Sequence, residues 1–375
     1  MQDGVLFAEL NRQGGPRGGT EFVAPNWWMG MASRNTSRGL LTFTSMLSLD
    51  PATLGEDGYR EIFQVGETVD GAPLVDHQHP HDFFMQLAGI WRIPLSAGTG
   101  LTIAGGPVGE PALGPVAFMH RASAEENPLA ALSHHTFDST HIAFGVVTAA
   151  VDRGRWVLEG SVFNGREPDE NRWDFDFGAL DSVSGRVWFR PAAGWEVQVS
   201  TGHLREPEAL EPGNVQRTTM SASWFEQDGD DFTAVTVGYG VNATDHGRRH
   251  AVFGEVTKRG GLNSIYARGE VLQPEIAKLL GCGSPGDCVE GDPADEHLRD
   301  ALGAFTIGGL RDVLRWRGFE GGLGASVTFY AVPEPLEATH GSHPASFQLF
   351  FRLRPPAGSS GRMRNMRMSS AHGGR

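Results

Sequence analysis

The sequence predicts an all-β protein: a closed antiparallel transmembrane β-barrel of about sixteen strands, in a range of about 14 to 18. Long loops are expected at one end and short turns at the other, and residues 1–354 would form this single barrel domain. Three observations predict it. The extended segments have two different faces, the composition excludes a helical membrane protein, and short and long connections alternate along the chain.

The segment 346–354 shows the two-faced pattern most clearly. In an extended strand, successive side chains point to opposite sides. One side is apolar and carries Phe347, Leu349, Phe351 and Leu353. The other side carries Gln348, Arg352 and Arg354. Because charged side chains rule out a dry core there, we expect lipid on the first side and water on the second.

The same alternation recurs in segments 195–200, 233–241, 249–256 and 262–272. Where these segments carry charged residues at mid-strand positions, the charges share one face. A soluble all-β protein is the alternative interpretation, but its strand interiors would carry fewer arginines. The recurrence therefore favours a barrel with an apolar outer face and a polar lumen.

Composition narrows the class further. Only 39% of the 375 residues are hydrophobic, the mean hydropathy is −0.26 and the net charge is −14. No segment approaches the roughly 18 uninterrupted apolar residues of a membrane-spanning helix. Only helices and closed barrels satisfy their backbone polar groups in lipid, so a membrane protein of this composition is a barrel. The acidic balance argues against a nucleic-acid partner, which would need a basic surface.

The predicted connections alternate in length. Short turns are expected near 35–37, 94–98, 152–154, 192–194, 227–230, 259–261 and 312–316. Long connections are expected near 11–20, 51–81, 107–139, 165–181, 205–214, 242–248, 274–299 and 332–345. With a first strand at 4–10, these fifteen connections join about sixteen strands. An even number of strands with both termini on the short-turn side is typical of bacterial outer-membrane barrels.

Two further features lie outside the predicted strands. Cys282 and Cys288 flank a Gly/Pro turn in a long connection, so we expect them to form a disulfide. Residues 355–375 are rich in Gly, Ser, Met and Arg with nothing to bury, and a flexible tail is expected. The tail contains Met363, Met366, Met368 and His372, which could hold Cu(I), although an unstructured tail is the more ordinary interpretation.

Three histidines lie in the second long connection with His-x-His-x-His spacing: His77, His79 and His81. In an extended backbone their rings would lie on one side, about 7 Å apart. They can share a metal only where the backbone bends, which Pro80 allows. Asp76 and Asp82 flank the three histidines, and we expect these carboxylates to orient the rings.

A second group of histidines lies in the third long connection, at His120, His134, His135 and His141. A single predicted hairpin joins the two connections, so both groups are expected at the same barrel end. Imidazoles suit copper or zinc, and the thioethers of Met85 and Met119 would favour copper. All seven histidines are candidate ligands. The simpler alternative is that they form hydrogen bonds with loop backbone inside the lumen.

Two other chemistries remain alternatives. A hydrolase would use Ser133 or Ser139 as the nucleophile, a histidine as the base and Asp138 to orient it, but neighbours in sequence rarely reach that geometry. A calcium site could use Glu167, Asp169, Glu170, Asp174 and Asp176. The arginines interleaved with these carboxylates, Arg166 and Arg172, favour salt bridges within the loop instead.

Three long motifs resemble those of a family of bacterial outer-membrane barrel proteins found near metal- and copper-handling genes. They are HQHPHDFFM at 77–85, GGPVGEPALGPVAFMHR at 105–121 and SVFNGREPDEN at 161–171. The resemblance covers most of residues 20–354. It implies the barrel fold and the outer-membrane location, but no activity and no set of ligands.

We therefore expect a porin-like barrel in a bacterial outer membrane, with a polar lumen constricted by loops that could bind or pass a transition metal such as copper. Inward charges expected to line the lumen are Glu159, Arg186, Arg268 and Glu270. The expected partners are membrane lipid and small ions or solutes, with a homo-oligomer or a protein partner left open. A structural or partner-binding barrel with a plugged lumen is the remaining alternative.

Overall fold

A computed structural model describes residues 1–281, 300–358 and 361–367. Seventeen strands belong to one antiparallel sheet. They are β1 (Gln2–Gln13), β2 (Gly19–Val23), β3 (Asn26–Thr36), β4 (Gly39–Leu47), β7 (Phe84–Ser96), β8 (Thr99–Gly109), β9 (Ala143–Arg153), β10 (Trp156–Phe163), β11 (Ser182–Phe189), β12 (Trp195–Leu204), β13 (Val215–Asp228), β14 (Asp231–Thr244), β15 (Gly247–Gly260), β16 (Asn263–Leu272), β17 (Leu302–Trp316), β18 (Phe319–Ala331) and β19 (Ala345–Arg354).

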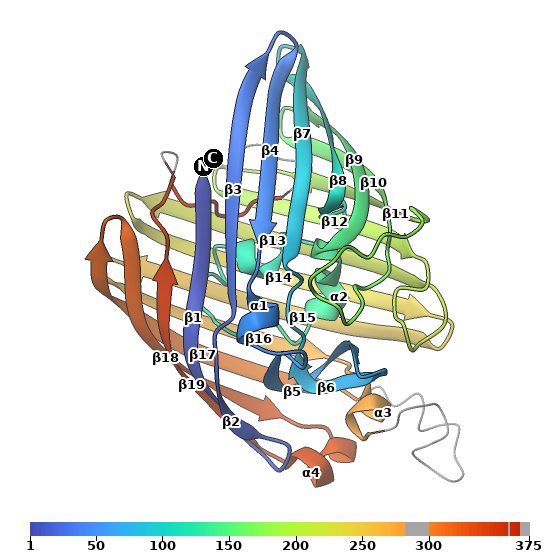
Figure 1. The fold of residues 1–375 in the computed structure, drawn as a ribbon, viewed down its shortest axis with the longest axis vertical. Helices are drawn as coiled ribbons and strands as arrows, with labels where there is room; N and C mark the ends of the chain where they lie inside the picture. Colours follow the sequence, from blue (N-terminus) through green and yellow to red (C-terminus); the bar gives the residue numbers. More distant parts are fainter. Residues whose placement is uncertain (282–299, 359–360, 368–375) are drawn as a thin grey trace.

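The sheet closes on itself as a barrel (Figure 1). One edge of β1 pairs with β19, from Leu6 opposite Leu353 to Arg12 opposite Phe347. The other edge of β1 pairs with both β2 and β3, so these two strands act as one strand interrupted at residues 24–25. Seventeen strands therefore fill sixteen positions, which confirms the predicted barrel.

The outer face of the wall is apolar and exposed, as the sequence predicts, but the inner face differs from the prediction. Large apolar side chains point outward, including Phe43, which is 66% exposed, and Ile265, which is 64% exposed. On the inner face Gln348 and Arg352 are completely buried. The expectation that the inner face meets water is wrong at these positions, because other parts of the chain cover it.

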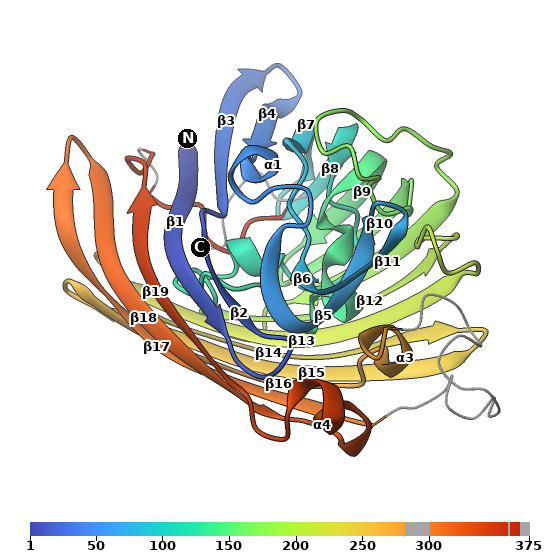
Figure 2. The same ribbon diagram turned by 60° about the horizontal axis from the view of Figure 1, so that its bottom comes forward.

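The long connections fill the lumen (Figure 2). The connection between β4 and β7 contains α1 (Asp50–Thr53) and a hairpin of β5 (Tyr59–Val69) and β6 (Ala72–Gln78). The connection between β8 and β9 contains η1 (Phe118–His120), α2 (His134–Phe137) and η2 (Ser139–His141). It runs against the inner wall, where Arg121 reaches Glu255 of β15 at 2.6 Å and Ser133 reaches Glu270 of β16 at 2.7 Å.

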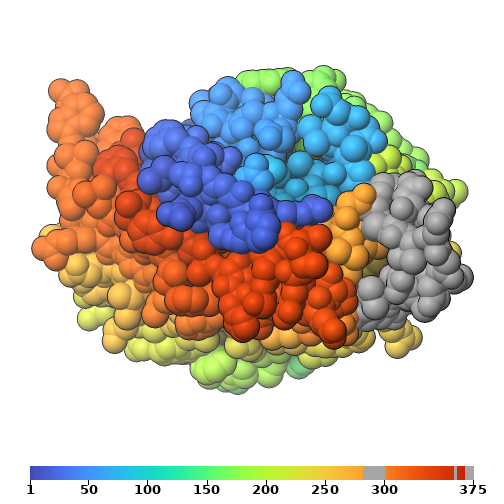
Figure 3. All heavy atoms as spheres, turned by 90° about the horizontal axis from the view of Figure 1, so that it is seen from below, coloured from blue at the N-terminus to red at the C-terminus, as the bar shows by residue number. Residues whose placement is uncertain are grey.

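The long-loop end also carries α3 (Ile276–Leu279) and α4 (Glu334–His340). Viewed from this end, the described residues present a nearly continuous surface of side chains (Figure 3). No helix in the described ranges is long and apolar enough to cross a membrane.

Two predicted connections are corrected. The segment 242–248 was expected to be long, but β14 and β15 are joined by a turn of only two residues, Asp245 and His246. The segment 312–316 was expected to be a turn, but β17 continues to Trp316, and the chain turns at Arg317 and Gly318 instead. The expected disulfide of Cys282 and Cys288 lies outside the described residues.

The C-terminal segment is also corrected where it is described. The expectation that it has nothing to bury is wrong for residues 361–367, because Met363 and Met366 are each 3% exposed. Arg364 pairs with Glu125 at 2.6 Å and Arg367 pairs with Glu196 at 3.4 Å. This segment therefore lies inside the barrel, toward the end that carries the short turns.

Candidate metal centre

The two histidine-bearing connections meet inside the long-loop end of the barrel, as the sequence predicts. The hairpin of β7 and β8 joins them. Strand β6 ends at Gln78, and residues 79–83 belong to no strand before β7 begins at Phe84. The rings of His79 and His81 lie against rings of the short helices α2 and η2, which carry the other group.

Five imidazole rings form one cluster: His79, His81, His134, His135 and His141. The ring centroids of His134 and His135 lie 5.0 Å apart, and those of His79 and His135 lie 5.6 Å apart. His141 lies 5.3 Å from His134 and 5.5 Å from His81. One nitrogen from each of His79, His134 and His135 falls within 4.8 Å of the others, a spacing that a single metal ion can bridge.

Every ring in this five-histidine cluster directs Nδ1 toward an oxygen. The partners are Glu67 at 3.2 Å from His79, Asp50 at 2.8 Å from His81, Asp138 at 2.7 Å from His134, Glu167 at 3.6 Å from His135, and the Asp138 carbonyl oxygen at 2.7 Å from His141. The Nε2 atom of each of the five rings is buried and has no hydrogen-bond partner within the described chain. Carboxylates that hold one imidazole nitrogen while the other binds the ion are the usual outer shell of metal-binding histidines.

His340 shows what a structural histidine looks like in this same molecule. It is completely buried, stacks on Phe63 at 4.6 Å, and uses both ring nitrogens, Nε2 toward Asp76 at 3.0 Å and Nδ1 toward Thr339 at 2.8 Å. Leaving a buried polar atom without a partner costs about 1–3 kcal/mol. Five such atoms lie together in the five-histidine cluster, whereas both ring nitrogens of His340 have partners.

The electrostatic environment keeps most of the cluster neutral. Burial lowers the pKa of His134 to about 4 and holds the pKa values of His79 and His141 well below the usual 6.5. Burial acts in the same direction on His135, but the neighbouring Glu167 outweighs it and raises the pKa of that ring. Neutral imidazole is the form that binds metals.

Two of the seven candidate ligands lie elsewhere. His77 stays on β6, with Nδ1 3.1 Å from the Val75 carbonyl oxygen and Nε2 4.0 Å from Asp57. His120 packs edge-on against Trp27 at 4.9 Å and makes no ring contact with the five-histidine cluster. Regular extended spacing predicted three equivalent rings, but β6 ends at Gln78, and only the two rings after this point join the cluster.

The prediction that Asp76 and Asp82 orient the rings is wrong. Asp76 accepts from Arg17 and faces His340, and Asp82 lies 3.7 Å from Arg172. The residues that orient the rings are Asp50, Glu67, Asp138 and Glu167. Of these, only the contact of Asp138 with His134 could be predicted from the sequence. Asp138 lies four residues after His134 and therefore on the same side of a helical turn.

The hydrolase alternative gains no support, and the calcium alternative is met only in part. Ser133 donates to Glu270 at 2.7 Å and Ser139 accepts from Arg217 at 2.9 Å, and no hydrogen bond in the described chain joins either serine to a histidine. In the calcium candidate, only Asp169, Asp174 and Asp176 converge. Of the interleaved arginines, Arg166 pairs with Asp181 in the same connection, and Arg172 pairs outside it with Glu67.

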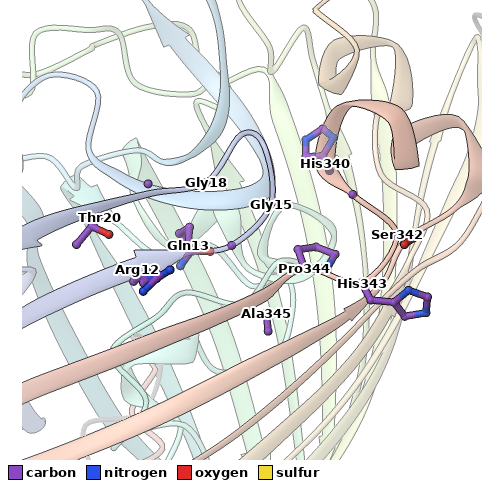
Figure 4. A pocket seen from close by; sticks show the side chains of 13 residues that line it. Arg12, Gln13, Gly15, Gly18, Thr20, His340, Ser342, His343, Pro344 and Ala345 are labelled. Carbon is purple, nitrogen blue, oxygen red and sulfur yellow. The ribbon is translucent and has the colours of Figure 1, made fainter.

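The predicted inward charges all face the lumen and are buried. Arg186 pairs with Glu159 at 2.6 Å, and Arg268 pairs with Glu270 at 3.1 Å. They therefore neutralise one another instead of lining open water. A separate open pocket of about 740 Å³ lies at the rim between the β1–β2 turn and the α4–β19 connection (Figure 4). Its histidines, His340 and His343, point in different directions.

Comparison with solved structures finds outer-membrane porins. The anion-selective porin of Comamonas acidovorans is 9% identical, with a TM-score of 0.54 over 94% of this chain and 98% of its own. OprB of Pseudomonas putida is 10% identical, with a TM-score of 0.57 over 94% and 93%. OmpT of Vibrio cholerae, in its trimer form, is 9% identical, with a TM-score of 0.51 over 94% and 98%. No family model and no curated protein matches the sequence.

At these identities the similarity concerns the fold, and the fold is that of a bacterial outer-membrane porin. The predicted location is thereby confirmed at the level of the fold. The barrel's own chemistry agrees, because closed antiparallel barrels with an apolar outer face are the β-structures that lipid accommodates.

Proposed function

We propose that this chain is an outer-membrane barrel of porin type whose loop-filled lumen binds a transition metal, copper or zinc. His79, His134 and His135 would hold the ion, with His81 and His141 adjacent. The observation that carries the proposal is the set of five buried Nε2 atoms without partners, each on a ring whose Nδ1 faces an oxygen. Imidazole donors suit copper and zinc better than calcium or magnesium.

The packing of the lumen supports binding over free passage of solutes. In a water-filled channel, inward side chains such as Arg186, Gln198 and Arg352 would be exposed, but here they are at most 2% exposed. Association of several barrels, as in the trimer form of OmpT, remains a prediction for this chain.

The direct test is a titration of zinc or Cu(II) into chelator-treated protein in detergent, followed by calorimetry and metal analysis. One tightly bound ion per chain is expected. If the protein binds neither ion above the level of an unrelated porin, the cluster is structural and the proposal fails.

Replacing the carboxylate that orients His134 is expected to weaken binding by about 10- to 100-fold, the usual cost of losing such a partner. Asp138→Asn keeps the shape and leaves an amide oxygen able to accept from the Phe118 backbone N–H, which donates to Asp138 Oδ2 at 2.9 Å. The substitution changes the group that faces His134 Nδ1 at 2.7 Å. Zinc affinity by competition with a chromophoric chelator measures the effect, and unchanged affinity would remove His134 from the site.

Acid is expected to weaken metal binding in two stages. The pKa of His135 is raised because Glu167 faces its ring, so this ligand protonates first and zinc affinity should begin to fall above the ordinary imidazole pKa of about 6.5. Burial holds the pKa of His134 at about 4 and those of His79 and His141 well below normal, so the remaining affinity should be lost only between about pH 5.5 and 4. Complete release of zinc above about pH 6, measured by titration in matched buffers, would contradict this.

A further inference from the structure

Methionines are concentrated in one part of the lumen. The chain has 10 methionines, and seven of them meet in a single apolar cluster beside η1. They are Met29, Met31, Met46, Met85, Met119, Met363 and Met366. An ordinary core would draw mainly on Leu, Ile, Val and Phe, so this concentration of thioethers needs a chemical reason.

Three of these methionines come from neighbouring strands of the inner wall. Met29 on β3 and Met46 on β4 are direct cross-strand partners, which places their side chains next to each other. Met85 lies at the start of β7, beside the residue that pairs with Met46. All three line a cavity of about 20 Å³, enough for one water-sized particle or ion.

Two imidazoles line the same cavity. His120 is 9% exposed, and its buried Nδ1 has no hydrogen-bond partner in the described chain. His141 belongs to the five-histidine cluster and reaches this cavity as well. A purely apolar core would not place an unpartnered ring nitrogen against it, because that atom loses its hydrogen bond to water and gains nothing in return.

The C-terminal segment brings a fourth thioether. Met366 lines the same cavity, and contacts of the neighbouring residues hold the segment in place. The Asn365 backbone N–H donates to the His120 carbonyl oxygen at 2.7 Å, and its side chain accepts from the Ala122 N–H at 3.1 Å. Arg367 lies over the Trp188 ring at 4.1 Å.

We propose that Met29, Met46, Met85 and Met366, with His120, form a second metal site that takes a soft monovalent cation, Cu(I) or Ag(I). Thioether sulfur is a soft donor that selects Cu(I) over the divalent ions which imidazole clusters prefer. The site differs from the five-histidine cluster in its donors and in the charge of its ion, and it does not depend on that cluster binding a metal.

The test is a calorimetric titration of Ag(I), which avoids the redox chemistry of copper. It uses a Cys282→Ser, Cys288→Ser background, because thiolates bind Ag(I), and zinc is added beforehand so that any divalent site is filled. One Ag(I) per chain is expected. The Met29→Leu, Met46→Leu, Met85→Leu variant, which preserves apolar volume, should lose at least about tenfold in Ag(I) affinity while zinc binding is unchanged.

Matched controls are Met31→Leu, in the same apolar cluster but not among the residues lining the cavity, and Met220→Leu on the exposed outer face; both should bind Ag(I) normally. Met366→Leu provides a second variant outside the barrel wall should the triple variant fail to fold, and it should also weaken Ag(I) binding. If Ag(I) shows no saturable binding, or binds these cavity variants as tightly as the background protein, the methionines are packing only and the proposal is overturned.

Discussion

Replacing His79 and His135 together by alanine is expected to lower zinc affinity by at least about a hundredfold, more than the 10- to 100-fold loss that follows removal of an orienting partner. The two rings come from different connections, lie 5.6 Å apart, and each presents a buried Nε2 without a partner. Two of the three nitrogens that fall within 4.8 Å of one another would be removed. The remaining His134 cannot hold the ion with comparable strength.

The measurement is zinc affinity by chelator competition, with folding checked by the heat-dependent gel mobility of the barrel. His77→Ala is the matched control, because this ring belongs to the same sequence motif but stays on β6, apart from the five-histidine cluster. It should bind zinc like the natural protein. Equal affinity and stoichiometry in the double variant and the control would show that the cluster is structural.

Replacing Arg352 by methionine is expected to cost about 3–5 kcal/mol of stability, the usual effect of breaking a buried ion pair. The guanidinium is completely buried, pairs with Glu126 of the lumen connection, and lies 2.6 Å from Asp312 of β17. Methionine has a similar volume, but it removes the positive charge that pairs with the carboxylates of Glu126 and Asp312.

Urea unfolding in detergent, followed by tryptophan fluorescence, measures this loss. Arg315→Met is the comparison, since the Arg315 side chain is 52% exposed and its nearest carboxylate oxygens are 3.6 and 3.7 Å away. Exposed pairs of this kind contribute about 0–1 kcal/mol. Similar unfolding midpoints for the two variants would mean that Arg352 does not tie the wall to the lumen connection.

The barrel was predictable because a wall strand has a period of two and an apolar outer face, as Phe347, Leu349 and Phe351 show. What covers the inner face was not predictable. Arg352 and Gln348 look the same in sequence whether they meet water or a folded loop, and here they meet other parts of the chain. The order of residues 361–367 was missed for a similar reason, since their partners, such as Glu125 and Glu196, lie far away in sequence.

The histidine cluster was predictable in outline and not in detail. Two histidine-rich connections separated by one hairpin must approach each other, and the structure brings five of the seven candidate rings together. Their orienting carboxylates depend on tertiary contacts. Asp50 and Glu67 are far from their histidines in sequence, so nothing in the local sequence indicates that they contact them. Asp76 is next to His77 in sequence, but it faces Arg17 and His340 instead.

The position of Arg362 bears on how the barrel is completed during folding. The seam between β1 and β19 joins the first and last strands of the chain, so this pairing has the largest sequence separation in the wall and a high entropic cost of closure. Arg362 donates to Asp3 of β1 at 3.1 Å and to Glu320 of β18 at 2.7 Å, which spans the seam on both sides of β19. Pairing of β1 with β19 closes the wall, and Arg362 links the strands on the two sides of β19.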